Sequence, residues 1–199
     1  MDDIWQPIWL SIRLATVTTA FLLVLGANPV VSNGSLMTAP DVAQRMKALR
    51  ARGGRLVVVD PRRTETAALA DTHLFVRPGS DALLLLALLQ VIFAEGLAAP
   101  GRLTDSLVGL EALRTICDEW TPERVAGPTG IDAAHIRQLA REFAASPAAV
   151  CYGRMGVSTQ AFGALSQWLI QLLNIVTGNL DREGGAMFTS PALDTRRSG

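Results

Sequence analysis

Short apolar runs alternate with amphipathic stretches along most of this chain. Residues 21–25 and 56–59 are uninterrupted apolar runs, and each ends in a turn with polar or glycine residues. Between them, residues 41–50 place apolar side chains at helical spacing with basic residues opposite. This order of strand, helix and strand is typical of a βαβ unit with parallel strands.

The alternation of strand-like and helix-like patterns continues to residue 177. It predicts a short helix or turn over 64–70, strands over 73–77 and 148–152, and helices over 82–95, 132–145 and 160–177. Asp132 is the expected N-cap of its helix, and residues 100–130 form a connection with two short helical patterns. The helix over 82–95 is apolar around its circumference, so we expect it to be buried. In the last helix we expect these side chains to face the core: Trp168, Leu169, Leu172, Ile175 and Val176.

These elements predict an α/β fold: a Rossmann-like, mostly parallel sheet with helices on both faces, preceded by an apolar N-terminal helix. We expect three parts, namely the apolar helical segment over 1–20, the α/β domain over 21–189 and a flexible tail over 190–199. The uninterrupted apolar part of the first segment is shorter than the roughly 20 residues of a membrane span. No signal for export is evident, so we expect a cytoplasmic protein whose residues 1–25 can contact a membrane.

Composition narrows the classes of partner. Eighteen basic and eighteen acidic residues leave a net charge of zero, which argues against nucleic acid as a partner. The two cysteines, Cys117 and Cys151, form no C-x-x-C motif, so they cannot build an iron–sulfur or zinc site alone. We expect both to be semi-buried thiols in a reducing cytoplasm. No Ser/His/Asp arrangement or paired carboxylate is evident, and His135 shares an exposed helical face with polar residues.

Candidate binding residues follow the predicted strands, where open parallel sheets bind their ligands. Gly26 permits close backbone approach, and Asn28 offers a donor and an acceptor. Asp60 can accept from ribose hydroxyls or cap a turn, and Arg62 can meet a pyrophosphate or lie on a solvated surface. Asp81 can cap a helix or accept two hydrogen bonds from the edge of guanine. A nicotinamide site is disfavoured, because no G-x-G-x-x-G motif is present.

Five segments in this order closely resemble molybdopterin oxidoreductases of the formate dehydrogenase and nitrate reductase group. They are Leu25-Gly-Ala-Asn-Pro, Asp60-Pro-Arg-Arg-Thr-Glu-Thr-Ala, Arg77-Pro-Gly-Ser-Asp, Tyr152-Gly-Arg-Met-Gly-Val-Ser-Thr-Gln and Leu173-Asn-Ile-Val-Thr-Gly-Asn-Leu-Asp. The resemblance runs from about Phe21 to Asp194. It implies the third domain of the large subunit, which holds one guanosine arm of the bis(molybdopterin guanine dinucleotide) cofactor of molybdenum.

The resemblance also assigns residues to the cofactor. Those implied to contact the nucleotide are Asn28, Asp60, Arg62, Gly79 and Asp81. Those implied to approach the pterin or the metal are Met155, Gly156 and Gln160. No residue of this chain is implied to be catalytic or to ligate the metal, because in the family the molybdenum ligand lies upstream of the G-x-N-P turn.

The segment in that upstream position has a different resemblance. Residues 4–19 resemble the start of molybdate ABC-transporter permeases. We therefore expect a cofactor-binding fragment of a molybdopterin-dependent oxidoreductase, related to formate dehydrogenase or nitrate reductase, which associates with other parts of a molybdoenzyme. The alternative is a non-catalytic, membrane-associated remnant of a gene fusion.

Overall fold

A computed structural model describes residues 19–33 and 39–187 of the chain. Within them, four parallel strands form one sheet in the order β3-β2-β1-β4. Their bounds are Phe21–Leu25 for β1, Arg55–Val59 for β2, Thr72–Leu74 for β3 and Ala149–Gly153 for β4. This arrangement confirms the predicted α/β fold with a parallel sheet. The order reverses between β1 and β4, which is the topological switch point of the sheet.

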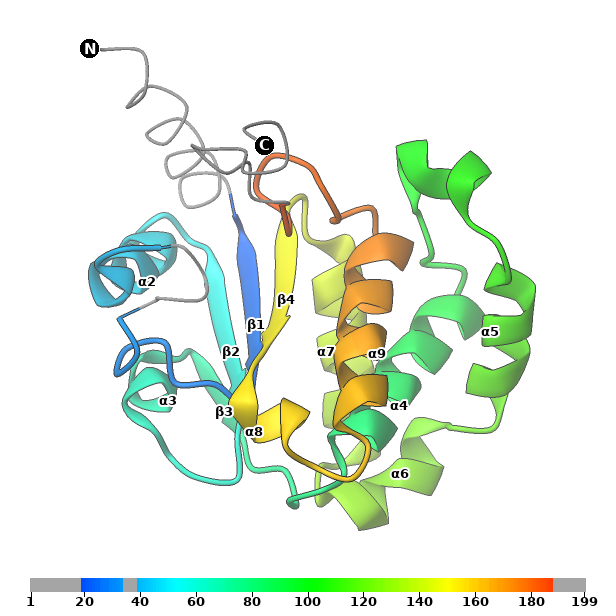
Figure 1. The fold of residues 1–199 in the computed structure, drawn as a ribbon, viewed down its shortest axis with the longest axis horizontal. Coiled ribbons are helices and arrows are strands. Elements are labelled where there is room, and N and C mark those ends of the chain that lie inside the picture. The colour runs from blue at the N-terminus through cyan, green and yellow to red at the C-terminus, as the bar shows by residue number, and fades with distance from the viewer. Residues whose placement is uncertain (1–18, 34–38, 188–199) are drawn as a thin grey trace, which may run out of the picture.

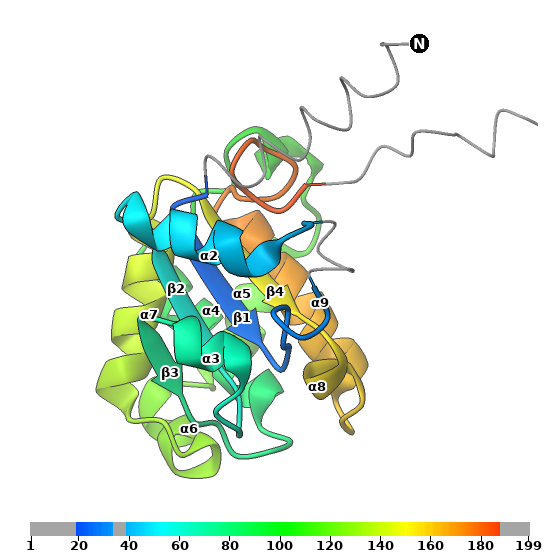
Figure 2. The ribbon, with the colours of Figure 1, turned by 90° about the vertical axis from the view of Figure 1, so that its left-hand side faces the viewer.

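Helices cover both faces of the sheet (Figure 1). Five of the helices in the described residues are α2 (Val42–Ala51), α3 (Glu65–Leu69), α4 (Asp81–Ala94), α5 (Leu110–Asp118) and α6 (Pro122–Thr129). The others are α7 (Ala133–Ala145), α8 (Met155–Ser158), α9 (Gly163–Val176) and a 3₁₀ helix over Gly101–Ser106. Figure 2 shows α2 and α3 on one face of the sheet, and α4, α7 and α9 lie on the other.

The alternation of side chains along β1 explains this layering. Leu23 and Leu25 pack toward α4, α7 and α9, whereas Leu22 and Val24 pack toward α2 and α3. All five side chains of β1 are buried. A strand covered on both faces reads as a continuous apolar run, which is why the sequence predicts it well. Helix α4 lies in the larger core with most of its circumference buried, as its composition predicts.

Two predicted elements differ from the structure. The third strand ends at Leu74 and not at Arg77, because its partner among the described strands, β2, ends at Val59. Beyond Leu74 the chain leaves the sheet, and the Arg77 backbone N–H donates to the carbonyl of Thr129. The helix predicted over 160–177 begins at Gly163, and the short helix α8 precedes it.

One side-chain prediction is wrong. Trp168 is 52% exposed, because the buried face of α9 carries Leu169, Leu173 and Val176 instead. Asp132 is the N-cap residue of α7, as predicted; its carboxylate makes no capping hydrogen bond and lies 3.6 Å from His135 Nδ1.

The apolar helix predicted over 1–20 falls almost entirely on residues 1–18, which lie outside the described part of the chain. Among the helices that are described, none has the length and apolar character needed to cross a membrane. The described chain begins and ends at the same edge of the sheet, opposite the carboxyl ends of the strands (Figure 1). There the Thr19 hydroxyl donates to the carbonyl of Gly184 at 2.9 Å.

Candidate functional site

The carboxyl ends of β1 and β4 meet through two glycines. The Gly156 N–H donates to the carbonyl of Gly26 at 2.9 Å. A Cβ on Gly156 would lie 2.7 Å from that carbonyl oxygen, and a Cβ on Gly26 would lie 2.7 Å from the backbone nitrogen of Val157. Gly26 also has a φ of 52°, which favours glycine. The switch point is therefore a tight backbone junction that requires glycine on both sides.

Asn28 joins the loop after β1 to the first turn of α3. Its Oδ1 accepts hydrogen bonds from the Thr66 backbone N–H at 3.2 Å and from the Thr66 hydroxyl at 2.7 Å. Its Nδ2 donates to Glu65 at 2.7 Å, and this hydrogen bond lowers the pKa of the Glu65 carboxyl. The Thr66 oxygen also accepts from the Val30 N–H at 3.2 Å. Asn28 thus caps α3 from another part of the chain, with one N–H of its amide left for a ligand.

Asp60 shapes the turn after β2. Its Oδ1 accepts from the Arg62 backbone N–H at 2.8 Å, and its backbone carbonyl lies 3.0 Å from His73 Nε2. This is the turn-capping role that the sequence offered beside ribose binding. The side chains of Arg62 and Arg63 are exposed, and neither has an ion-pair partner among the described residues.

Asp81 is the more deeply buried of two carboxylates at this edge, with 3% of the residue exposed against 9% for Asp60. It is the first residue of α4, where the helix dipole favours a negative charge. Gln160 Nε2 donates to its Oδ2 at 2.8 Å and also to the carbonyl of Gly156. Burial raises the pKa of the Asp81 carboxyl and the charge of Asp60 adds to the rise, whereas the hydrogen bond from Gln160 lowers it.

Arg154 lies at the turn between β4 and α8. Its Nε is a buried N–H donor without a hydrogen-bond partner among the described residues. A buried donor left unpaired costs about 1–3 kcal/mol. An acceptor supplied by a ligand or another chain segment would remove that cost. Sequence reasoning missed this residue because nothing in the pattern shows that the Nε of this partly buried arginine is shielded from solvent.

The structure brings most of the sequence-predicted residues into one row along the carboxyl edge. Gln160 contacts both Asp81 and Gly156, and Gly156 contacts Gly26. A Cβ on Gly79 would lie 3.7 Å from Gln160 Oε1, so Gly79 borders the same group. Asp60 acts on Asp81 through its charge.

The remaining predicted residues lie around this row. Asn28 is held at α3, Arg62 is exposed on the turn after β2, and Met155 is 61% exposed at the start of α8. Thr66 and Glu65 were missed as partners of Asn28, although both lie within a segment quoted for the family resemblance. Their contact with Asn28 bridges 37 and 38 positions of sequence, which no local pattern reports.

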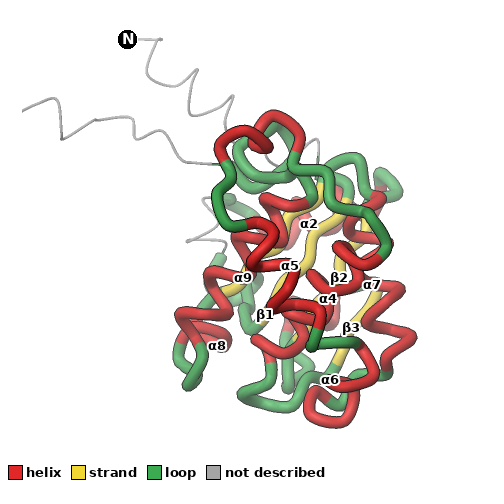
Figure 3. The backbone as a smooth tube through the Cα atoms, turned by 90° about the vertical axis from the view of Figure 1, so that its right-hand side faces the viewer, coloured by secondary structure: helices red, strands yellow, loops and turns green. Residues whose placement is uncertain are grey.

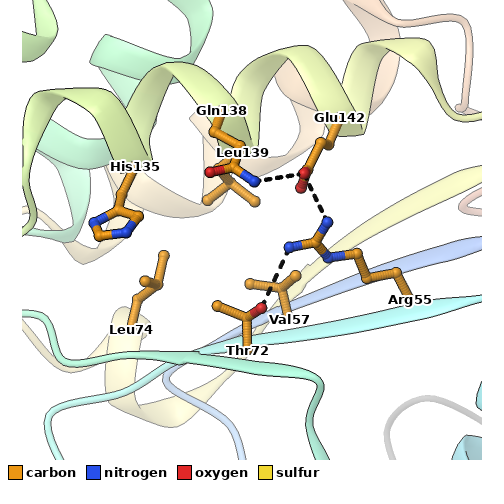
Figure 4. A pocket seen from close by; sticks show the side chains of 8 residues that line it. All are labelled: Arg55, Val57, Thr72, Leu74, His135, Gln138, Leu139 and Glu142. Atoms are coloured by element: carbon orange, nitrogen blue, oxygen red, sulfur yellow. Dashed lines mark hydrogen bonds and ion pairs between the residues drawn. The ribbon is translucent and has the colours of Figure 1, made fainter.

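A separate small cavity lies between α7 and the strands β2 and β3 (Figure 4). Arg55 crosses it to Glu142 at 2.6 Å and to the Thr72 hydroxyl at 3.3 Å, and Gln138 Nε2 donates to Glu142 at 2.9 Å. Its volume of about 30 Å³ has room for one or two water molecules. Because its polar groups already satisfy one another, this cavity is not the candidate site.

Within the described ranges, no cluster of three or more His, Cys, Asp or Glu side chains could hold a metal ion. Both cysteines are free thiols, and both are buried more deeply than the semi-buried positions expected from the sequence. Burial raises the pKa of Cys117 to about 11 and also raises the pKa of Cys151. The row along the carboxyl edge offers hydrogen-bonding groups, and such groups suit an organic ligand.

Comparison with known proteins gives a consistent result. The model of the molybdopterin oxidoreductase family matches residues 11–196. Formate dehydrogenase H of Escherichia coli (strain K12) is 34% identical over 164 residues, which are 82% of this chain and 22% of that protein. Nitrate reductase of Klebsiella oxytoca is 35% identical over 135 residues, which are 68% of this chain and 15% of that protein.

A solved structure supports the same relationship. Acetylene hydratase from Pelobacter acetylenicus superposes with a TM-score of 0.72 at 29% sequence identity, over 83% of this chain and 23% of that chain. The chain thus spans less than a quarter of the length of these relatives. Their names describe a dehydrogenase, a reductase and a hydratase, so the likeness does not select one reaction.

Proposed function

The chain belongs to the molybdopterin oxidoreductase family, and from that premise we propose that it binds one guanosine arm of a molybdopterin guanine dinucleotide cofactor. In this proposal, the whole enzyme to which this unit corresponds is related to formate dehydrogenase or nitrate reductase. The observation that carries the proposal is the buried Asp81 carboxylate at the carboxyl edge of the sheet. The proposed cytoplasmic location and the domain limits at 20 and 189 stay predictions from the sequence.

A guanine base fits the chemistry of Asp81. The ring N–H and the exocyclic amine of guanine are two neighbouring donors, and a carboxylate presents two acceptor oxygens. Gln160 donates to one oxygen of Asp81, and each oxygen has a second lone pair for a ligand. Adenine lacks both donors at that edge, so the carboxylate would face its ring nitrogen. The site is therefore expected to prefer guanine nucleotides.

Phosphate groups fit the cationic residues around the same edge. Arg62 and Arg63 are exposed without ion-pair partners among the described residues, and Arg154 has an unpaired buried N–H. Guanidinium groups suit phosphate oxygens because their planar donors match two oxygens at once. Gly26 and Gly156 let the loops after β1 and β4 meet at the switch point, because a Cβ on either residue would collide with the other loop.

When bound, a molybdenum–pterin group supplies the redox chemistry of such an enzyme. The residues of this chain hold and orient the group rather than react. Asp81 selects the base, Gln160 fixes the orientation of Asp81, and Asn28 keeps the loop after β1 in place through Thr66. None of the described residues is proposed as a ligand of the metal.

Calorimetric titration of GDP and ADP against the full chain tests the proposal. We expect GDP to bind more tightly, and Asp81→Asn to remove most of that preference while the protein stays folded. Charge-assisted hydrogen bonds are worth about 1.5–3 kcal/mol, so one such bond corresponds to roughly a 10- to 150-fold preference. Asp105→Asn, which changes an exposed aspartate in the 3₁₀ helix, is the matched control and should leave the preference intact.

Two results would contradict the proposal. One is equal affinity of the wild-type chain for GDP and ADP. The other is a preference for GDP that survives Asp81→Asn, since the base would then be recognised elsewhere. Thermal melts of each variant show whether a lost preference reflects unfolding instead.

A further inference from the structure

Strand β4 lies at one end of the sheet, with β1 as its partner among the described strands. Directly after β4, the Arg154 N–H donates to the carbonyl of Leu25 in β1. Successive residues of a strand direct their backbone N–H and C=O groups to opposite sides of it. The backbone groups of Ala149, Cys151 and Gly153 therefore point away from β1. A strand edge of this kind offers its N–H and C=O groups to another strand.

Two buried asparagines occupy this outer edge. Asn174 of α9 accepts a hydrogen bond from the Cys151 N–H at 2.8 Å through Oδ1, and its Nδ2 donates to the Cys151 carbonyl at 3.0 Å. Asn179, in the loop after α9, accepts from the Ala149 N–H at 3.0 Å through Oδ1. Asn174 is 0% exposed and Asn179 is 1% exposed, so water does not compete for these contacts. The amide of Asn174 thus presents to Cys151 the donor and the acceptor that a neighbouring strand would present.

The end of α9 holds both amides in place. The Asn179 N–H donates to the carbonyl of Asn174 at 2.7 Å, and Asn179 Nδ2 donates to the Thr177 hydroxyl at 2.9 Å. The Thr177 hydroxyl donates in turn to the carbonyl of Leu173 at 2.7 Å. Both ends of each amide are therefore satisfied in a single orientation.

The spacing of α9 matches the spacing of β4. Alternate residues of a parallel strand are about 6.6 Å apart, and residues four positions apart on a helix are about 6 Å apart. Ile170, one turn before Asn174, lies against Gly153, where a Cβ would collide with the Cδ1 of Ile170. Gly153 and Cys151 thus meet Ile170 and Asn174 in turn. Figure 3 shows α9 on the flank opposite α7, so this contact lies at the β4 end of the sheet.

The sequence of β4 would make an open edge prone to pairing. Residues 148–153 contain no charged residue and no proline, which are features that keep strand edges apart in natural proteins. By contrast, β3 at the other end of the sheet is only three residues long, and a short edge strand pairs poorly. The edge that matches β4 in length and polarity is β4 of a second copy. A two-fold axis would bring two such edges together as antiparallel strands.

We propose that Asn174 and Asn179 close the outer edge of β4 and thereby prevent it from pairing with β4 of a second copy of this chain. Asn174 carries the larger part of this role, since it satisfies both backbone groups of Cys151. Neither asparagine belongs to the proposed nucleotide site, so the role is independent of the ligand.

Size-exclusion chromatography with light scattering on the full chain tests the proposal. Asn174→Leu keeps a branched side chain of similar shape and removes both the donor and the acceptor. We expect this variant to form dimers and larger assemblies at concentrations at which the wild type stays monomeric. In its monomer fraction, the Cys151 amide should exchange with deuterium roughly tenfold faster than in the wild type, which corresponds to the loss of about one hydrogen bond. Gln171→Leu makes the same replacement at an exposed position of α9 and should match the wild type in both measurements.

Residue-resolved hydrogen exchange on the assemblies identifies the surface that associates. The amides of Ala149 and Cys151 should be protected again there, because a second β4 strand would accept their hydrogen bonds. Assemblies that leave these amides unprotected, or a folded Asn174→Leu that stays as monomeric as the wild type, would overturn the proposal. Asn179→Ala removes the acceptor for Ala149 alone and should give a smaller shift in the same direction. It decides the question if Asn174→Leu fails to fold, since a monomeric Asn179→Ala would then refute the role.

Discussion

The hydrogen bonds of Asn28 provide a quantitative test of how the site is held together. Asn28→Ala removes the acceptor for the Thr66 backbone N–H and for the Thr66 hydroxyl. Thr66 is fully buried, and an unsatisfied buried donor costs about 1–3 kcal/mol. Because Asn28 is only half-buried, water can replace part of its role.

We therefore expect Asn28→Ala to lower the free energy of unfolding by about 2–4 kcal/mol. At roughly 2–4 °C per kcal/mol for a chain of this size, the melting temperature should fall by roughly 5–15 °C. Urea unfolding followed by circular dichroism measures the loss. Gln44→Ala, which changes an exposed amide on α2, should stay within about 0.5 kcal/mol of the wild type.

A second pair of variants tests Glu65, which accepts a hydrogen bond from the Nδ2 of Asn28. Asn28→Asp keeps the acceptor oxygen for both Thr66 donors but places a second carboxylate oxygen against Glu65, to which the amide donates at 2.7 Å. Adding Glu65→Gln should recover stability that Asn28→Asp alone loses. A loss below about 0.5 kcal/mol for Asn28→Ala, or no coupling between the two positions, would refute the capping role.

Three further predictions concern single positions. Gly156→Ala should destabilise the fold by about 1–3 kcal/mol in urea melts, because its Cβ would lie 2.7 Å from the carbonyl of Gly26. Gly127→Ala, with nothing within 4 Å of its Cβ, should be neutral or slightly stabilising, and equal losses would contradict the steric argument. Burial raises the pKa of the Asp81 carboxyl in the folded state, so the folded protein holds the Asp81 proton more tightly than the unfolded chain does. The resulting contribution to the free energy of unfolding is fully present below the unfolded pKa of about 3.9 and is lost as the pH rises through the folded pKa. Asp81→Asn should therefore gain stability relative to the wild type at pH 7, with the gain shrinking toward pH 3.5 in melts across that range; a constant difference would argue against burial of the charge. Burial raises the pKa of Cys117 to about 11, so native protein at pH 8 should resist an aromatic disulfide reagent that labels it after unfolding, and prompt labelling would show that the thiol is accessible.

The sequence predicts well those elements whose environment is uniform. The apolar runs of β1 and β2 read as buried strands because helices cover both of their faces. The predicted face of α2 is also confirmed, since basic and polar residues mark its exposed side and Val42, Met46 and Leu49 are buried. In each case the local pattern alone determines the burial.

The errors and omissions arise where burial depends on distant parts of the chain. Helix α9 contains no charged residue, so no charge marks its exposed side, and the expectation that Trp168 faces the core was wrong. The sequence places Asp81 at the start of a helix, but its hydrogen bond with Gln160 spans 79 positions. Only the packing of α4 against α9, with α8 beside it, brings these two residues together.

The hydrogen bond between Thr19 and Gly184 has a consequence for engineering. The backbone enters and leaves this unit at nearly one point, so the unit has the geometry of a cassette that can be spliced into a loop of another protein. The splice point lies at the amino edge of the sheet, and five-residue strands at about 3.3 Å per residue separate it by roughly 15 Å from the carboxyl edge. Exchange of the cassette between relatives would therefore leave the contacts between Asp81 and its neighbours intact. The ligand preference of these residues would move with the cassette into the recipient protein.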